Sequence, residues 1–364
     1  MKAIDNIDIS SITNSGITLT ESTAPIVVIG AGKIVQDAHL VAYKIAGFTV
    51  KGIYDQDFLK AEAVALRFNI PEVYRSIQEL VEKNGQNVIY DVAVPGFAIT
   101  EILVELPDYC SVLLQKPMGE NIDQARHILN ICEQKQLSAG VNFQLRYAPY
   151  ILMLKQMISV GALGDICDLE IHLNVFTPWN LWDFLFSAPR VEILYHSIHY
   201  IDLIRNLIGN PDGIFAKTTK HPQMENLHSV KSNIIMDYGD FLQANIFTNH
   251  VHDFGPEKQD SYFKVEGTKG AVKIQLGLNM DYPKGSNDKF EYILKNHGGD
   301  CLWQELPIIG SWFPHGFIGS MNQMMQNKNN RLLQLDNSVQ DCFATMVCVE
   351  KAYQSFVPAI NWEI

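Results

Sequence analysis

Two side chains in this sequence can move a proton and stabilise charge, although they lie far apart in the chain. His199 lies in the segment YHSIHYID, residues 195–202. An imidazole has an unperturbed pKa of about 6.5, so it can act as a base near neutrality. Lys116 follows the apolar run Val112–Leu114, and its ammonium can polarise an oxygen atom. A buried core histidine and an ordinary surface lysine are the competing interpretations.

The residues around His199 are spaced for one face of a helix. On an α-helix, Tyr195, His199, Asp202 and Asn206 would form a polar stripe at spacings of 4, 3 and 4. Gly209 is expected to end this helix. We predict that His199 is the catalytic base and that Tyr195 orients the substrate.

His196 and His199 also form an HxxH pair, which can be interpreted as a metal site. However, no HExxH pattern and no cysteine partner accompanies the pair. We therefore expect no bound metal, and we place His196 among the substrate-binding residues.

A glycine loop follows the short β-branched run Ile26–Ile29 and precedes a helical segment. In a dinucleotide site, Gly30 would make the tight turn, and Gly32 would let the backbone approach a pyrophosphate at the helix N-terminus. We expect Lys33 and Ile34, the next two residues, to contact the cofactor as well. The third small residue of the motif is replaced by Val35, so an ordinary strand-to-helix turn remains the alternative.

Asp55 ends the predicted second strand, 23 positions after Gly32. A carboxylate there can accept hydrogen bonds from both ribose hydroxyls and would repel a 2′-phosphate, which favours NAD over NADP. A solvated turn residue is the alternative for Asp55. The nearby Asp57 is the better candidate for a helix N-cap.

Three further residues are predicted to line the cofactor site. Ser76 is placed on the adenine side. Pro95 and Gly96 follow the predicted strand Val88–Val94, and Gly96 would permit a close backbone approach.

Arg146 either binds an anionic or polyhydroxy group or makes a structural salt bridge.

Aromatic residues before the His199 helix are candidates for sugar binding. Trp179 and Trp182 offer flat faces that suit the C–H surface of a sugar ring, although two tryptophans are as often part of a core. Four more residues are candidates for the rim of the pocket: His250, His252, Trp312 and His315.

The elements that would position these residues change in type part-way along the chain. Strands and helices alternate up to about residue 145, which predicts a parallel, doubly wound α/β sheet of the Rossmann type. Later strand candidates follow one another without helices, which predicts an α+β domain with a large open, mostly antiparallel sheet. We expect an N-terminal extension (1–24), a nucleotide-binding domain (25–145) and a substrate-binding domain (146–364), whose last helix, near 338–355, packs back on the first domain. The stretch 285–299 is predicted to be a loop.

Composition narrows the class of protein. The 364 residues are 47% hydrophobic and 19% charged, as in a globular protein with a sizeable core. The net charge of −12 argues against nucleic acid and anionic membranes as partners. Six scattered cysteines without a CxxC pair favour free thiols, and no signal-peptide pattern is present, so we expect a cytoplasmic protein.

Ordered along the chain, several segments resemble the Gfo/Idh/MocA family, which includes glucose–fructose oxidoreductase and inositol dehydrogenase. The resemblance covers about residues 25–355, and the ordered set is more specific than any one segment. Its segments are GAGKIV (30–35) with DAHL (37–40), QKPM (115–118), NFQLRYAP (142–149), GALGDI (161–166), HYIDLIR (199–205), EGTKG (266–270) and TMVCVEKAY (345–353).

The resemblance implies an NAD-dependent oxidoreductase that acts on a small sugar, polyol or sugar acid. Lys116 would then polarise the reacting oxygen and bind both cofactor and substrate, and His199 would accept the hydroxyl proton. Most relatives are dehydrogenases and many oligomerise through the open sheet, so we expect a homodimer or homotetramer.

The sequence departs from the family pattern near the predicted reaction centre. Tyr195 stands where the family usually has an aspartate, and Gln115 replaces the usual glutamate beside the lysine. Ile99 occupies a position where relatives often have a histidine. Two alternatives therefore stay open: NAD-dependent glycoside or ether cleavage through transient oxidation, and a non-catalytic regulator that binds NAD and a sugar.

Overall fold

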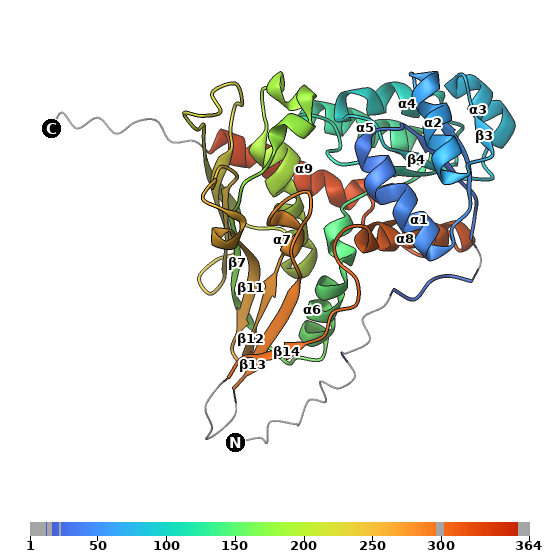
Figure 1. Cartoon of the computed structure of the whole chain (residues 1–364). Coiled ribbons are helices and arrows are strands. Elements are labelled where there is room, and N and C mark those ends of the chain that lie inside the picture. Colours follow the sequence, from blue (N-terminus) through green and yellow to red (C-terminus); the bar gives the residue numbers. More distant parts are fainter. Residues whose placement is uncertain (1–11, 13–16, 22, 296–301, 356–364) are drawn as a thin grey trace. The chain divides into compact units, whose positions relative to one another are not determined.

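The computed structural model describes residues 12, 17–21, 23–295 and 302–355 (Figure 1). These residues form two compact units. Of the described residues, the first unit contains 17–21, 23–152 and 309–346, and the second contains Ile12, 153–295, 302–308 and 347–355. The sequence predicts that residues 146–364 form the substrate-binding domain, with only the last helix packing back on the first domain, whereas residues 309–346 group with the first unit. Most of the expected N-terminal extension and Cys301 lie outside the described residues.

The first unit is built on a parallel sheet, as the sequence predicts. Among the described residues it has six strands in the order β3-β2-β1-β4-β5-β6, which is the strand order of a doubly wound nucleotide-binding fold. Strands β1, β4 and β5 are fully buried, because helices cover both faces of such a sheet. The strands are β1 (Ile26–Ile29), β2 (Val50–Tyr54), β3 (Glu72–Val73), β4 (Ile89–Val92), β5 (Ser111–Leu114) and β6 (Ser138–Val141).

Polar caps fix where several helices of this unit begin. Asp57 caps α2 by accepting the Lys60 amide at 3.2 Å, which confirms the prediction for Asp57. Asn121 caps α5 in the same way, accepting the Gln124 amide at 3.0 Å. The helices are a π-helical segment (Val35–His39), α1 (Leu40–Ala46), α2 (Phe58–Phe68), α3 (Ile77–Asn84), α4 (Ile99–Glu105) and α5 (Ile122–Gln134).

Helix α8 (His315–Asn329) is a part of the first unit that sequence reasoning missed. It lies beside α1 (Figure 1), and Phe317 and Met321 join the buried core that supports the sheet. Gly316 and Gly319 bring it close to the backbone of Gln144 and the side chain of Tyr147, where a Cβ would lie within 2.5 Å of its neighbours. Because the helix is buried on most of its surface, its sequence lacks an amphipathic pattern.

The second unit is built on a mixed, mostly antiparallel sheet. In the described part of the chain it has eight strands in the order β14-β13-β12-β11-β7-β10-β9-β8, and only β7 and β10 pair in parallel. Several of these strands lie side by side in Figure 1. The strands are β7 (Ile166–Asn174), β8 (Gly213–Thr219), β9 (Lys231–Asp237), β10 (Gln243–Asn249), β11 (Asp260–Gly267), β12 (Gly270–Gln275), β13 (Lys289–Leu294) and β14 (Gln304–Leu306).

One strand of this sheet contradicts the loop predicted for residues 285–299. Strand β13 lies inside that stretch and pairs with β12 and β14. Only Phe290 of this strand is fully buried, so its alternation of polar and apolar residues is weak. Pairing with neighbouring strands therefore stabilises β13, although its local sequence pattern does not predict a strand.

The helices of the second unit include a π-helical segment (Ile193–Ser197) that continues directly into α7 (Ile198–Ile208). The chain passes between the units within α6 (Pro149–Ser159) and within α9 (Val339–Gln354). No helix among the described residues has the length and apolar character that crossing a membrane requires. Of the five cysteines in the described part, Cys167 alone is exposed, and all five are free thiols.

Candidate active site

The glycine loop of the first unit begins with a turn that requires glycine. Gly30 has φ of 111°, and a Cβ at this position would lie 2.5 Å from the Ala93 carbonyl oxygen. The Gly30 amide donates to the Tyr54 carbonyl at 2.7 Å, which ties the loop to the end of β2. The loop is therefore held at the carboxyl edge of the sheet between β2 and β4.

The next residues leave space for a ligand beside the loop. A Cβ on Gly32 would meet no atom within 4 Å, so the backbone here faces open space. Lys33 is exposed and pairs with Asp37 at 3.4 Å, whereas Ile34 is partly buried against the core. Of the residues predicted for this loop, Gly32 is the one whose surroundings fit the close approach of a pyrophosphate.

Asp55 lies directly beside this loop, as the sequence predicts. Its Oδ2 accepts the Ala31 amide at 2.6 Å, and its Oδ1 accepts the Asp57 amide at 3.0 Å. Lys60 approaches the same carboxylate at 3.9 Å. These contacts hold the carboxylate at the end of β2, where a ribose hydroxyl would be recognised.

Lys116 emerges at the same edge, two residues after the end of strand β5, which lies between β4 and β6. Its amide donates to the Gln115 side-chain oxygen at 3.0 Å, and its own side chain is half-buried. Desolvation by burial lowers the pKa of Lys116 to about 8. The lysine can therefore exist in either protonation state near neutral pH, as a residue taking part in proton chemistry would.

Gly96 packs closely against another loop of the first unit. A Cβ on Gly96 would lie 3.2 Å from the Pro117 carbonyl oxygen and from the Gly119 carbonyl carbon. The close approach is therefore to the segment that follows Lys116, and it holds the loops after β4 and β5 together. Pro95, the residue before it, is exposed and precedes a short 3-10 helix at Gly96–Ala98.

Two other predicted residues have structural partners in the first unit. The Ser76 hydroxyl caps α3 by accepting the Glu79 amide at 3.1 Å. Arg146 is completely buried and pairs with Asp341 at 2.7 Å and with Asp336 at 3.6 Å. Its contacts therefore favour the structural salt bridge, one of the two interpretations of Arg146.

In the second unit, His199 lies in α7 and is buried, with 6% of its surface exposed. Asp202 is buried on the same helix, which ends at Gly209 as predicted. Tyr195 belongs instead to the preceding π-helical segment, where its ring lies 5.4 Å from that of Phe184. The expected stripe therefore does not follow one regular α-helix, because the wider π turn changes the angular position of Tyr195 relative to His199.

Two residues that the sequence reasoning did not place together surround His196. Glu192 and His250 are both completely buried, and the ring of His250 lies 4.2 Å from that of His196. His250 is thus an interior residue and not part of a rim. Glu192 lies four residues before His196, so its spacing was a signal for this contact, but the position of His250 depends on strand β10.

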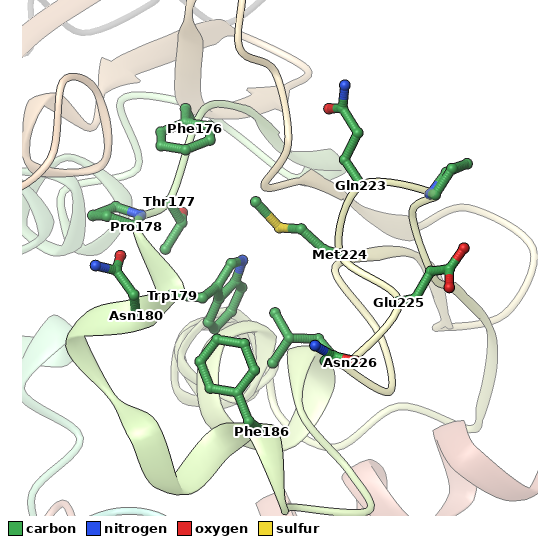
Figure 2. Close-up of a pocket in the computed structure, with 12 residues that line it drawn as sticks. Phe176, Thr177, Pro178, Trp179, Asn180, Phe186, Gln223, Met224, Glu225 and Asn226 are labelled. Atoms are coloured by element: carbon green, nitrogen blue, oxygen red, sulfur yellow. The ribbon is translucent and has the colours of Figure 1, made fainter.

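Trp179 and Trp182 lie close together in the second unit, in or at the edge of one small apolar core. Trp179 is buried in a small apolar core that Trp182 joins from its edge. Trp179 also lines a cavity of about 390 Å³ with Phe176, Thr177 and Met224 (Figure 2). In this view the Met224 side chain extends toward Thr177 and Trp179, whereas the Glu225 carboxylate points away.

Comparison with known proteins identifies the family. A profile described as an oxidoreductase family with an NAD-binding Rossmann fold matches residues 25–143, and one described as the GFO/IDH/MocA C-terminal domain matches residues 151–273. Glucose-6-phosphate 3-dehydrogenase of Bacillus subtilis is 30% identical over 266 residues, which cover 69% of this chain and 74% of that protein. The chain belongs to the Gfo/Idh/MocA family.

Solved structures of other proteins share the fold. One is an oxidoreductase from Agrobacterium radiobacter in complex with NAD+, L-tartaric acid and magnesium, with a TM-score of 0.77 and 17% identity over 92% of this chain and 96% of that one. Another is levoglucosan dehydrogenase in complex with NADH and levoglucosan, with a TM-score of 0.76 and 15% identity over 92% and 97% of the two chains. Like other members of the Gfo/Idh/MocA family, this protein is an NAD(P)-dependent oxidoreductase, and its first unit is the NAD-binding domain.

The position of Asp55 leads to a prediction about cofactor choice. Replacing Asp55 with asparagine should weaken NAD+ binding about tenfold, since a hydrogen bond to a charged group is worth about 1.5–3 kcal/mol. The same change should improve NADP+ binding relative to NAD+, because it removes a charge that repels a 2′-phosphate. Titration of both nucleotides by calorimetry measures the two affinities.

Asp57→Asn is the matched control, because asparagine caps a helix about as well as aspartate. It should leave both affinities unchanged. Equal effects of the two substitutions would contradict a ribose contact by Asp55.

Proposed function

We propose that this protein is an NAD-dependent dehydrogenase that oxidises a secondary hydroxyl of a sugar or polyol, or reduces the corresponding ketone. The observation that carries the proposal is Lys116, whose desolvated ammonium lies at the edge of the sheet that also holds the glycine loop and Asp55. Membership of a family of sugar and polyol oxidoreductases supports the same reaction.

The first unit would hold the nucleotide through Gly32 and Asp55, with the glycine loop facing the pyrophosphate. When bound, the nicotinamide supplies a hydride acceptor at C4. Lys116 would donate a hydrogen bond to the substrate oxygen and stabilise the negative charge that develops there. His199 would accept the hydroxyl proton as the carbon–oxygen double bond forms.

The substrate is proposed to carry an anionic group. The family's usual carboxylates are absent at Tyr195 and Gln115, so an anion close to the reaction centre meets less repulsion here than in relatives that retain them. Tyr195 has a phenol that can orient the substrate by a hydrogen bond without adding charge. Phosphorylated sugars and sugar acids are therefore the first substrates to test.

The reaction is tested by following NADH formation with a panel containing glucose 6-phosphate, gluconate, levoglucosan and myo-inositol. We expect turnover with at least one anionic member, and a rate that falls as pH rises above about 8, because Lys116 then loses its charge. Release of a sugar fragment without net NADH formation would indicate cleavage chemistry instead. NAD+ binding with no turnover of any substrate would contradict the proposal.

We also propose that copies of this chain associate through the open face of the second sheet. One face of this sheet is buried by Ile171, Phe263 and other apolar residues. On the other face, the half-buried rings of His172, Phe247 and Tyr262 stack in a row across three strands, with ring centres 4.9 and 5.2 Å apart. A homodimer or homotetramer would cover this aromatic row.

A further inference from the structure

Three potential metal ligands meet inside the second unit. Glu192, His196 and His250 each offer one ligand atom, and these atoms all lie within 4.8 Å of one another. They come from two parts of the fold, because Glu192 and His196 flank the first turn of the π-helical segment and His250 directly follows β10. The sequence offered only the HxxH pair and no third ligand.

Within the described part of the chain, two buried atoms of this cluster have no hydrogen-bond partner. They are Nε2 of His250 and Oε2 of Glu192, and both side chains are completely buried. The His250 Nε2 atom lies 3.4 Å from Glu192 Oε1, beyond the usual hydrogen-bond range of about 2.7–3.2 Å. Leaving such atoms unsatisfied in a protein interior is costly, so a group placed between them would stabilise the fold.

The surroundings hold both residues in ligand-like orientations. The Thr177 hydroxyl lies 2.8 Å from Nδ1 of His250 and can accept a hydrogen bond from Nδ1–H, and in this tautomer Nε2 carries a lone pair. The Ser197 hydroxyl donates to Glu192 Oε1 at 2.6 Å. Trp179 packs against the His250 ring at 5.1 Å, and it shares the cavity of Figure 2 with Thr177.

We propose that Glu192, His196 and His250 form a binding site for a divalent transition-metal ion, with Zn²⁺ as the best match. Two imidazoles and one carboxylate are a common ligand set for Zn²⁺ and related ions, and they leave a further coordination position for water or a ligand oxygen. A divalent cation would compensate the buried Glu192 carboxylate and engage both unpartnered atoms. The site lies next to the proposed catalytic residues in sequence, because His196 directly follows Tyr195 and precedes His199 by three residues. Metal binding by the three side chains does not depend on the proposed dehydrogenase chemistry.

The test is to strip the full-length protein with a chelator, remove the chelator, and titrate it with Zn²⁺ by calorimetry. We expect one ion per chain with a micromolar or lower Kd, and a higher Tm in the presence of Zn²⁺, because a ligand that binds only the folded state stabilises it. Loading with Co²⁺ should give visible absorption bands that report nitrogen and oxygen ligands. An ion-pair cluster without a metal would show neither stoichiometric binding nor these bands, and this result would overturn the proposal.

Substitutions test which side chains bind the ion. His196→Gln is the main variant, because His196 is only half-buried and its loss should leave the fold intact. It should weaken Zn²⁺ binding at least tenfold and change the Co²⁺ bands, and Glu192→Gln should do the same where circular dichroism shows a folded protein. His228→Gln removes an exposed histidine and serves as the control. Equal binding by wild type, His196→Gln and His228→Gln would show adventitious surface binding and would overturn the proposal.

Discussion

Replacing Lys116 with methionine is expected to lower kcat by about a thousandfold while changing the Kd of NAD+ by less than threefold. Methionine keeps much of the length of the side chain but cannot donate a hydrogen bond or carry charge. Removing one such donor from a developing oxyanion typically costs about 10²–10³ in kcat. The nucleotide should still bind, because the glycine loop and Asp55 make the proposed contacts with it.

The same substitution should make the protein more stable at neutral pH. Because the pKa of Lys116 is lowered to about 8, protonated Lys116 destabilises the folded state relative to the unfolded chain, where lysine titrates near 10.4. This cost is fully present below pH 8 and disappears as pH rises toward 10.4. Lys116→Met should therefore raise Tm by a few degrees at pH 7, and the gain should shrink above pH 8.

Stopped-flow kinetics, nucleotide titration and thermal unfolding measure these three effects in one set of samples. Lys44→Met is the control, because Lys44 is exposed on α1 and should alter none of them. If Lys116→Met lowers both the activity and the Tm, Lys116 supports the fold. A variant that keeps full activity would refute the catalytic role.

The parts of this structure that could be predicted from sequence depend on local chemistry. The turn at Gly30 and the cap at Asp57 are set by residues within a few positions of one another. Asp55 could be placed because parallel strands bring their carboxyl ends to one edge of a sheet. Helix caps and the alternation of strands and helices determine these features, whatever fold the rest of the chain adopts.

The features that escaped prediction depend on partners distant in sequence. Arg146 finds Asp336 and Asp341 nearly two hundred positions later, in the segment that carries α8 back to the first unit. His250 reaches Glu192 only because β10 is hydrogen-bonded between β9 and β7. No pattern within a short window contains this information, so the partners of Arg146 and the cluster of Glu192, His196 and His250 required the structure.

The π-helical segment before α7 shows a third limit. The sequence of this region fits an α-helical stripe from Tyr195 to Asn206, but the backbone widens at Ile193–Ser197. Such π turns recur at functional sites, where they alter which side chains share a face. Here the wider turn separates the environment of Tyr195, beside Phe184, from that of His199 in the regular helix.

Because their environments differ, we expect substitutions of His199 and Tyr195 to affect different kinetic constants of the proposed reaction. His199→Asn is expected to lower kcat by about 10²–10⁴-fold, the usual contribution of general base catalysis, with little change in the Kd of NAD+. Tyr195→Phe removes only a hydroxyl that orients the substrate, so its main effect should be a higher KM.

The decisive measurement for His199 is the kinetic isotope effect with a substrate deuterated at the carbon that is oxidised. Hydride leaves this carbon as the hydroxyl proton leaves for the base, so loss of the base slows this step and should raise the isotope effect on kcat toward its intrinsic value. His228→Asn, at an exposed position, should leave both kcat and the isotope effect unchanged. A folded His199→Asn variant with wild-type kcat would show that another group accepts the proton, and the assignment of the base would then have to move to a different residue.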